Sequence, residues 1–189
     1  MIQLRTLAHK QNRPVYLALT SLTQGVTVLA QGQVSAAVAL IEEAIAELHA
    51  ARARHMMTYH LSILATAYAQ AGAIHKGLAT LQEAFTLVER TEERFWEAEL
   101  HRLQGELLLQ LSDQNVAAAE AAFQRSLHIA QAQQVKSLEL RTVTSLSRLY
   151  QSQGKAQEAR YILAELYAWF TEGFATRDLR TAKALLDSL

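Results

Sequence analysis

The sequence contains no cysteine, one proline and seven glycines among its 189 residues. Without cysteine, the chain can form neither disulfides nor thiolate metal sites. The scarcity of proline and glycine favours long helices joined by short turns over a sheet with many hairpins. Hydrophobic residues make up 50% of the chain and charged residues 19%. This composition is too apolar for a disordered chain and is sufficient for a buried core.

Neither sign of charge is in excess, because 18 Lys and Arg residues balance 18 Asp and Glu residues. Nucleic-acid-binding proteins usually carry a basic excess, since contacts with phosphates supply much of their affinity. No apolar run approaches the ~20 residues that a membrane span needs, and the segment from Met1 to Arg5 does not resemble the start of a signal peptide. We therefore expect a cytoplasmic protein that binds neither nucleic acid nor membranes.

A pattern of small and large residues recurs along the chain, starting at Gly25, Ala65, Gly105 and Ser147. Small residues let two helices approach closely, and large residues fill the space on either side. The four copies comprise Gly25, Val28, Gly32, Ala37, Ile41 and Ala44; Ala65, Tyr68, Gly72, Gly77, Leu81 and Ala84; Gly105, Leu108, Ala119, Phe123 and Ser126; and Ser147, Tyr150, Gly154, Ala159 and Leu163.

This pattern resembles the tetratricopeptide repeat (TPR), a pair of antiparallel helices, A and B, of about 34 residues. The resemblance implies an all-α, right-handed α-solenoid of about four TPR-like helix pairs, with a longer repeat of about 40 residues and a C-terminal capping helix. We expect a single superhelical domain over residues 1–189. Its repeats are predicted at 14–55, 56–93, 94–135 and 136–173, and its cap at 174–189.

Residues 1–13 resemble the second half of a B helix whose A helix is missing. Because a repeat cannot bury its face alone, this segment indicates either part of a longer solenoid or a stack completed by another copy. The alternative is a frayed N-terminal arm.

The turn residues agree with this register. Gly32, Gly72 and Gly154 each follow a helical run, where a left-handed residue ends a helix. Ser35 is expected to cap the helix that begins at Ala36, and Pro14 to lie in a first turn. Helices are predicted at 14–30, 34–53, 56–71, 75–90, 94–111, 115–133, 136–152, 156–172 and 178–188.

The resemblance also indicates where a partner would bind, because A helices line the concave surface of TPR arrays. The polar candidates for this groove are Tyr59, Ser62, Thr66, Gln70, Glu99, Arg102, Glu106, Gln110, Arg141, Thr144, Arg148 and Gln151. The first A helix instead presents an apolar stripe of Leu19, Leu22, Val26 and Leu29. A preceding repeat, a homodimer contact or the N-terminal segment would each cover this stripe.

Three of the groove arginines, Arg102, Arg141 and Arg148, suggest a site for a carboxylate or phosphate, because a guanidinium offers a planar fork of donors. The favoured alternative is that Glu99, Glu106 and Glu139 neutralise them in a solvated ion-pair face.

No catalytic, cofactor-binding or metal-binding motif is present. His49, His55 and His60 are spaced by six and five residues, so they do not share a helical face, and no HExxH, Walker, GxGxxG or GxSxG pattern occurs. The adjacent pairs Glu42-Glu43 and Glu92-Glu93 diverge on a helix and are expected to be solvated surface pairs rather than an acid/base couple. We therefore expect that the protein is not an enzyme and that it binds neither a cofactor nor a metal ion.

Two stretches carry a more specific resemblance: residues 93–109, with Phe95-Trp96 and His101-Arg102, and residues 118–189, with Trp169-Phe170. They resemble the C-terminal TPR region of large bacterial regulators that join a cyclase or DNA-binding domain to a STAND-type ATPase. The resemblance implies a non-catalytic module that binds a protein, peptide or ligand as the sensor or scaffold of such a regulator. The alternative is a self-assembling structural repeat protein.

Overall fold

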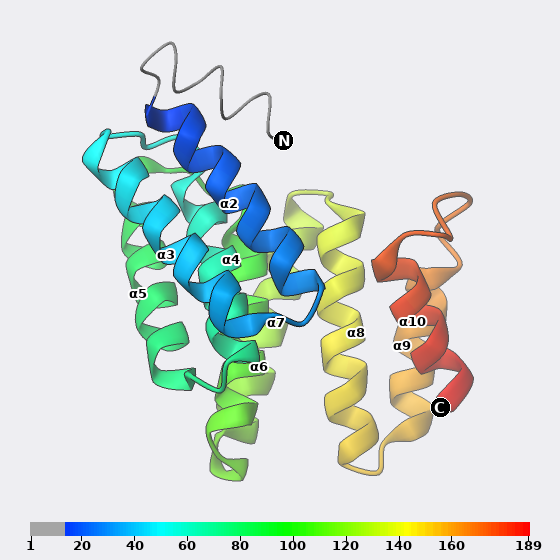
Figure 1. The fold of residues 1–189 in the computed structure, drawn as a ribbon. Coiled ribbons are helices and arrows are strands. Elements are labelled where there is room, and N and C mark those ends of the chain that lie inside the picture. Colours follow the sequence, from blue (N-terminus) through cyan, green and yellow to red (C-terminus); the bar gives the residue numbers. More distant parts are fainter. Residues whose placement is uncertain (1–13) are drawn as a thin grey trace. The chain divides into compact units, whose positions relative to one another are not determined.

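The computed structural model describes residues 14–189, and the expectations for residues 1–13 lie outside this range (Figure 1). The described chain consists of helices and turns and contains no strand. The helices are α2 (Pro14–Ala30), α3 (Val34–Ala50), α4 (Met57–Gln70), α5 (Ile74–Thr91), α6 (Glu97–Leu111), α7 (Val116–Ala132), α8 (Lys136–Ser152), α9 (Ala156–Tyr167) and α10 (Arg177–Ser188), with a 3₁₀ turn, η1 (Asp113–Asn115), before α7. The all-helical fold class is confirmed. Over residues 14–189, no helix combines the length and apolar character needed to cross a membrane.

The chain divides into two compact units, Met1–Arg94 and Phe95–Leu189. In the first unit, α2 pairs with α3 and α4 pairs with α5, and α3 also contacts α4. In the second unit, α6 pairs with α7 and α8 pairs with α9, while α10 packs on both α8 and α9. The organisation of the repeats into one superhelical domain stays a prediction.

Within each helix pair, small residues lie where the two helices cross. A Cβ atom added to Gly25 of α2 would lie only 2.6 Å from Ile41 Cγ1 of α3. In the fourth pair the Ser147 hydroxyl, fully buried, donates to the carbonyl oxygen of Ala159 at 3.2 Å. The recurring small positions therefore mark the close approach of A to B helices that the sequence pattern predicts.

The three turn glycines adopt the predicted left-handed conformation, with φ of 79° at Gly32, 69° at Gly72 and 77° at Gly154. After each glycine, the next backbone N–H bonds back into the helix, as from Ala73 N to Tyr68 O at 2.9 Å. This is the Schellman arrangement, which satisfies carbonyl groups at the end of a helix. The prediction for Ser35 was wrong, because α3 begins at Val34 and no side chain caps it.

The C-terminal helices form their own apolar cluster. Leu163 and Leu166 of α9 are buried against Leu179, Ala182 and Leu185 of α10. The predicted helix over 156–172 ends earlier, at Tyr167. The segment that follows α9 instead reverses direction and returns the apolar face of α10 to the core.

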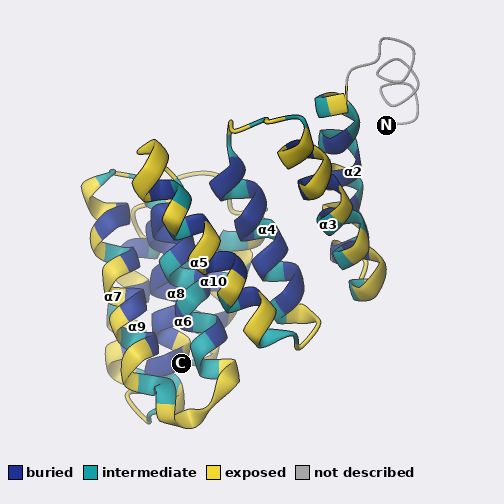
Figure 2. Ribbon diagram, turned by 90° about the vertical axis from the view of Figure 1, so that its left-hand side faces the viewer, coloured by how far each residue is buried: buried dark blue, intermediate teal, exposed yellow. Residues whose placement is uncertain are grey.

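Helix α8 is the most enclosed helix of the second unit, because it contacts α6, α7, α9 and α10 (Figure 2). Several of its buried residues are hydroxyl residues. The hydroxyls of Thr142 and Thr144 donate to carbonyl oxygens one turn earlier in the same helix, at 2.9 and 2.7 Å. Each hydroxyl is thereby satisfied without a ligand, as buried polar groups must be.

Candidate functional site

In the first unit, the polar groove candidates lie on α4, and two of them form hydrogen bonds within the helix. Ser62 is buried and its hydroxyl donates to Tyr59 O at 2.7 Å, while the Thr66 hydroxyl donates to Ser62 O at 2.9 Å. Gln70 is exposed at the end of the helix. Ser62 therefore offers no accessible group to a partner, whereas Tyr59 and Thr66 are partly exposed.

The four apolar candidates for self-association on α2 do not form one exposed stripe. Leu22 and Leu29 are buried, Leu19 is half-buried, and only Val26 is exposed, at 40%. Packing of α2 against α3 and α4 covers most of this face. Self-association through α2 stays a prediction.

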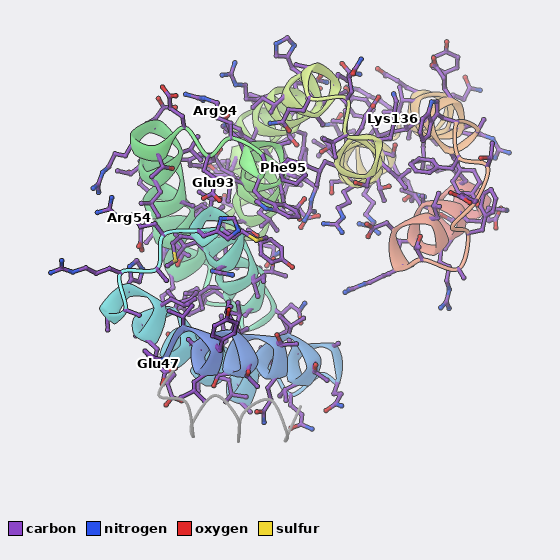
Figure 3. All side chains as sticks on the ribbon, turned by 90° about the horizontal axis from the view of Figure 1, so that it is seen from above. Glu47, Arg54, Glu93, Arg94, Phe95 and Lys136 are labelled. Atoms are coloured by element: carbon purple, nitrogen blue, oxygen red, sulfur yellow. The ribbon has the colours of Figure 1, made fainter. Side chains whose placement is uncertain are left out.

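A carboxylate of the second helix pair is less solvated than the sequence suggested. Glu93, on the segment after α5 (Figure 3), accepts the backbone N–H of Met56 at 2.9 Å and the Thr58 hydroxyl at 3.3 Å. Both groups lie at the start of α4, whose N-terminal N–H groups and dipole favour a negative charge. Glu42 likewise accepts a hydrogen bond from the Tyr68 phenol. The expectation of a solvated surface carboxylate was therefore wrong for Glu93, whereas the Glu42 side chain is 43% exposed and stays a surface residue.

The second unit brings several groove candidates together around one arginine of α6. Both Arg102 Nε and Nη2 donate to the two carboxylate oxygens of Glu99 at 2.8 Å. Arg102 Nη1 donates to Glu106 Oε1 at 2.5 Å. The Arg102 side chain is only 12% exposed. A bidentate pair with this little solvent is a fixed structural element rather than a free anion receptor.

The network continues to α8 and α10. The Ser145 hydroxyl donates to Glu106 Oε1 at 2.8 Å, and Arg141 Nε donates to Asp178 Oδ2 at 2.6 Å. Arg141 Nη1 also lies 3.7 Å from Glu99 Oε1. These contacts join three helices of one unit through charged and polar side chains.

Arg102 and Arg141 are paired with carboxylates, as the ion-pair alternative expected, but the pair of Arg102 with Glu99 is buried rather than solvated, and one partner differs. The predicted partner Glu139 pairs instead with Lys136, at 2.6 Å, on its own helix. Asp178 of α10, which sequence spacing did not suggest, supplies the missing carboxylate.

The carboxylates keep the Arg102 guanidinium charged. Burial by itself would lower the pKa of Arg102, and this is the largest single influence. Glu99, then Glu106 and Asp178, oppose it and raise the pKa above its ordinary value. Arg102 therefore acts as a permanent cation that orders the surrounding carboxylates.

Four groove candidates of the second unit retain surface that a partner can reach. Gln110 and Arg148 are exposed, and Glu106 and Gln151 are partly exposed. They lie on α6 and α8, which contact each other. Thr144, by contrast, is buried and contributes no accessible group.

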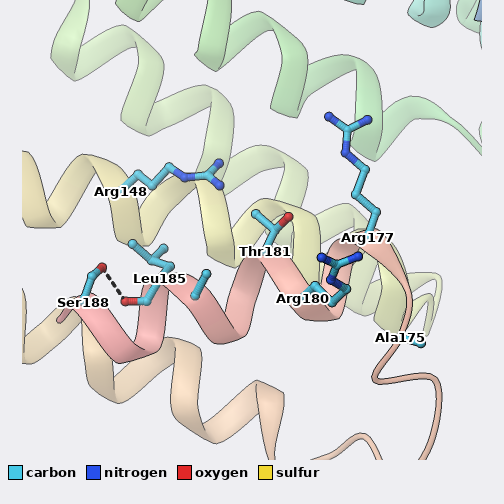
Figure 4. A pocket seen from close by; sticks show the side chains of 8 residues that line it. Arg148, Ala175, Arg177, Arg180, Thr181, Leu185 and Ser188 are labelled. Carbon is cyan, nitrogen blue, oxygen red and sulfur yellow. Dashed lines mark hydrogen bonds between the residues drawn. The ribbon is translucent and has the colours of Figure 1, made fainter. Parts of the chain in front are cut away.

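Arg148 lines a hollow whose other lining residues lie on α10 and just before it (Figure 4). It extends from α8 beside this open hollow, which Arg177 and Arg180 of α10 also line. Among the described residues, no carboxylate lies within 4.0 Å of any of these three guanidinium groups. Arg177 and Arg180 were not candidates in the sequence, because the final helix was assigned only a capping role. Their spacing of three residues on one helix was the available signal.

The histidines that the structure describes form no metal site. Within residues 14–189, no group of three or more His, Asp or Glu side chains is placed to hold a metal ion. His60 is buried, and burial lowers its pKa, with Glu93 opposing the effect. It is therefore a neutral core residue near pH 7.

Paired antiparallel helices that cross at small residues give the described chain a TPR-like helical-repeat fold. No family model and no curated protein matches the sequence. The fold is similar to the nearly identical TPR-like repeats assigned to a kinesin light chain of Podosopora anserina, with 20% identity, 93% of this chain and 86% of that chain covered, and a TM-score of 0.65. It is also similar to BtubC (BKLC) from P. vanneervenii, with 19% identity and a TM-score of 0.71. The match covers 98% of this chain and 84% of that chain.

Proposed function

We propose that this chain is a non-catalytic module that binds a protein or peptide partner through its A helices. The observation that carries the proposal is the ordered polar surface on α6 and α8. Accessible groups at Glu106, Gln110 and Gln151 lie on helices that the network around Arg102 holds together. A surface that is ordered before binding loses less side-chain entropy when a partner arrives.

The sensor or scaffold role within a bacterial signalling regulator is the more specific form of this proposal. It depends on the resemblance of residues 93–109 and 118–189 to the TPR regions of such regulators. The TPR-like fold supports an interaction role, since helical-repeat proteins present extended surfaces for binding. In a larger protein, the partner bound by this module would determine the state of the domains joined to it.

The test is a selection of binding peptides from a random library displayed on phage, using the purified chain. The affinity of the selected peptides is then measured for a double variant, Gln110→Arg with Gln151→Arg, which changes the A helices α6 and α8. The matched control is Gln82→Arg with Gln157→Arg, two exposed positions on the B helices α5 and α9. Both variants add the same charge, so they separate the A-helix surface from a general effect of charge.

We expect the A-helix variant to lose binding and the control to retain it. Selected peptides that bind both variants equally, or that lose binding only in the control, would contradict the proposed surface.

A further inference from the structure

We propose that the hollow between α8 and α10 binds an acidic peptide segment, with Arg148, Arg177 and Arg180 donating hydrogen bonds to the carboxylates of the peptide. The inference rests on the proposed function and names the chemistry of the partner. It extends the groove candidates, of which Arg148 was one, by Arg177 and Arg180 of α10.

These three arginines differ from Arg102 and Arg141 in having no ion-pair partner among the described residues, and they differ from other unpaired arginines in lining one hollow. Arg102 and Arg141 lie in the same unit, and both are neutralised by carboxylates within 4.0 Å. Arg148, Arg177 and Arg180 line one hollow and have no carboxylate within that distance among the described residues. Like charges gathered without counter-charges repel one another, so an anionic ligand is the stabilising addition that the site lacks.

Two of the arginines lie at the N-terminal end of α10, where a positive charge destabilises the helix. Arg177 and Arg180 lie in the first four residues of α10. The N-terminus of a helix carries a partial positive charge, so basic residues there are unfavourable and acidic ones favourable. Asp178 is the one acidic residue in this turn, and it is engaged with Arg141. The dipole and the two guanidinium groups therefore act together on any anion in the hollow.

The remaining walls of the hollow fit a peptide chain. Its volume is about 760 Å³, and it is open to solvent. Ala175, Ala184 and Leu185 provide apolar surface, and Thr181 and Ser188 add hydroxyls. The Ser188 hydroxyl donates to Leu185 O at 2.8 Å (Figure 4), which leaves its oxygen able to accept a backbone N–H. Carboxylates, small apolar side chains and main-chain amides would each find a complementary group.

A peptide fits this hollow better than a nucleic acid. No aromatic side chain from residues 14–189 lines it, whereas proteins that bind single strands stack bases on aromatic rings. The whole chain has a formal net charge of zero, so it lacks the overall basic excess that is usual in proteins that bind phosphate backbones.

The test is fluorescence anisotropy with the full chain and a labelled, C-terminally amidated peptide in which Glu alternates with Ala. A peptide with Gln at every Glu position is the ligand control. The site variant is the triple change Arg148→Gln, Arg177→Gln and Arg180→Gln. Its control is Arg90→Gln, Arg125→Gln and Arg160→Gln, three exposed arginines on B helices with no carboxylate within 4.0 Å among the described residues. Circular dichroism confirms that both variants fold.

We expect binding of the Glu peptide, none of the Gln peptide, and a loss of about tenfold in affinity in the site variant, since each exposed ion pair contributes modestly. The control variant should retain its affinity. Equal loss in both triple variants would overturn the site, as would no binding of the Glu peptide. A Gln peptide with a free C-terminal carboxylate tests whether the terminal group is the anion that is recognised. Binding of this peptide as tight as that of the amidated Glu peptide would contradict recognition of side-chain carboxylates.

A single-stranded oligonucleotide of equal charge is the last comparison. Tighter binding of the oligonucleotide than of the Glu peptide, lost in the site variant, would overturn the assignment to a peptide. If the Glu peptide fails to bind while library peptides still depend on Gln110 and Gln151, the inference fails and the proposed function stands.

Discussion

Gly105 of α6 lies directly against the ring of Phe123 in α7. A Cβ atom at Gly105 would come within 2.5 Å of Phe123 Cε1, a distance that real Cβ contacts do not adopt. Both residues are buried, and both belong to the recurring size pattern, as a small residue of the A helix and a large residue of the B helix. The pair shows how the pattern in the sequence becomes a close helix crossing.

Substituting Gly105→Leu should destabilise the third helix pair. The added side chain cannot displace Phe123 without moving α7, so we expect a loss of about 3 kcal/mol in the free energy of unfolding. Urea unfolding followed by circular dichroism measures it. The control is Ala164→Leu, on the exposed face of α9, which should have little effect. Unchanged stability of Gly105→Leu would reject the assigned register.

Removing Arg102 should cost far more than removing Arg148. Arg102→Met leaves Glu99 buried without its bidentate partner, and breaking a buried pair typically costs about 3 kcal/mol. Arg148→Met removes an exposed side chain without an ion-pair partner, and should cost less than about 0.5 kcal/mol. Thermal unfolding of both variants measures the difference. Similar melting temperatures would mean that the Arg102 network is solvated.

Glu93→Ala should destabilise the second helix pair by about 1 kcal/mol, because it removes the acceptor for Met56 N–H and Thr58 at the start of α4. Glu43→Ala, at an exposed position of α3, is the matched control. The readout is the amide exchange of the first turn of α4 together with chemical unfolding. If the two variants behave alike, Glu93 does not cap α4.

At the left-handed turn positions, a change from glycine to alanine should lower the stability of the protein, and a change to glycine should raise it. Gly72→Ala adds a Cβ that meets no atom within 4 Å, so its cost of about 1 kcal/mol comes only from the backbone conformation. Gln134, with φ of 58°, occupies the equivalent turn position after α7, and Gln134→Gly should relieve part of that strain. Denaturant midpoints test both changes. A stabilising Gly72→Ala would contradict this account of the turn.

The fold was predictable because its signals are local. Helix ends depend on glycines such as Gly32, and the helix crossings depend on sizes at positions such as Gly25 and Ile41, all within one pair. The predicted end of the helix that begins at Ala156 was the least accurate, because nothing in the sequence of that helix marks its end at Tyr167. That end depends on the return of α10 to the core.

The site was less predictable because it depends on residues far apart in sequence. The pairing of Arg102 with Glu99 and Glu106 follows from spacings of three and four on one helix. Asp178, on α10, pairs with Arg141 across 37 positions, and no periodicity indicates such a contact. Arg177 and Arg180 were missed for the same reason, since only the packing of α10 on α8 brings them near Arg148.

The most direct test of the A-helix surface is an NMR titration of the isotopically labelled chain with one peptide selected from the library. The expected result is that amide shifts change at exposed positions of α6 and α8, including Gln110 and Gln151, while α7 and α9 change little. Shift changes confined to the exposed faces of α7 and α9 would contradict binding through the A helices.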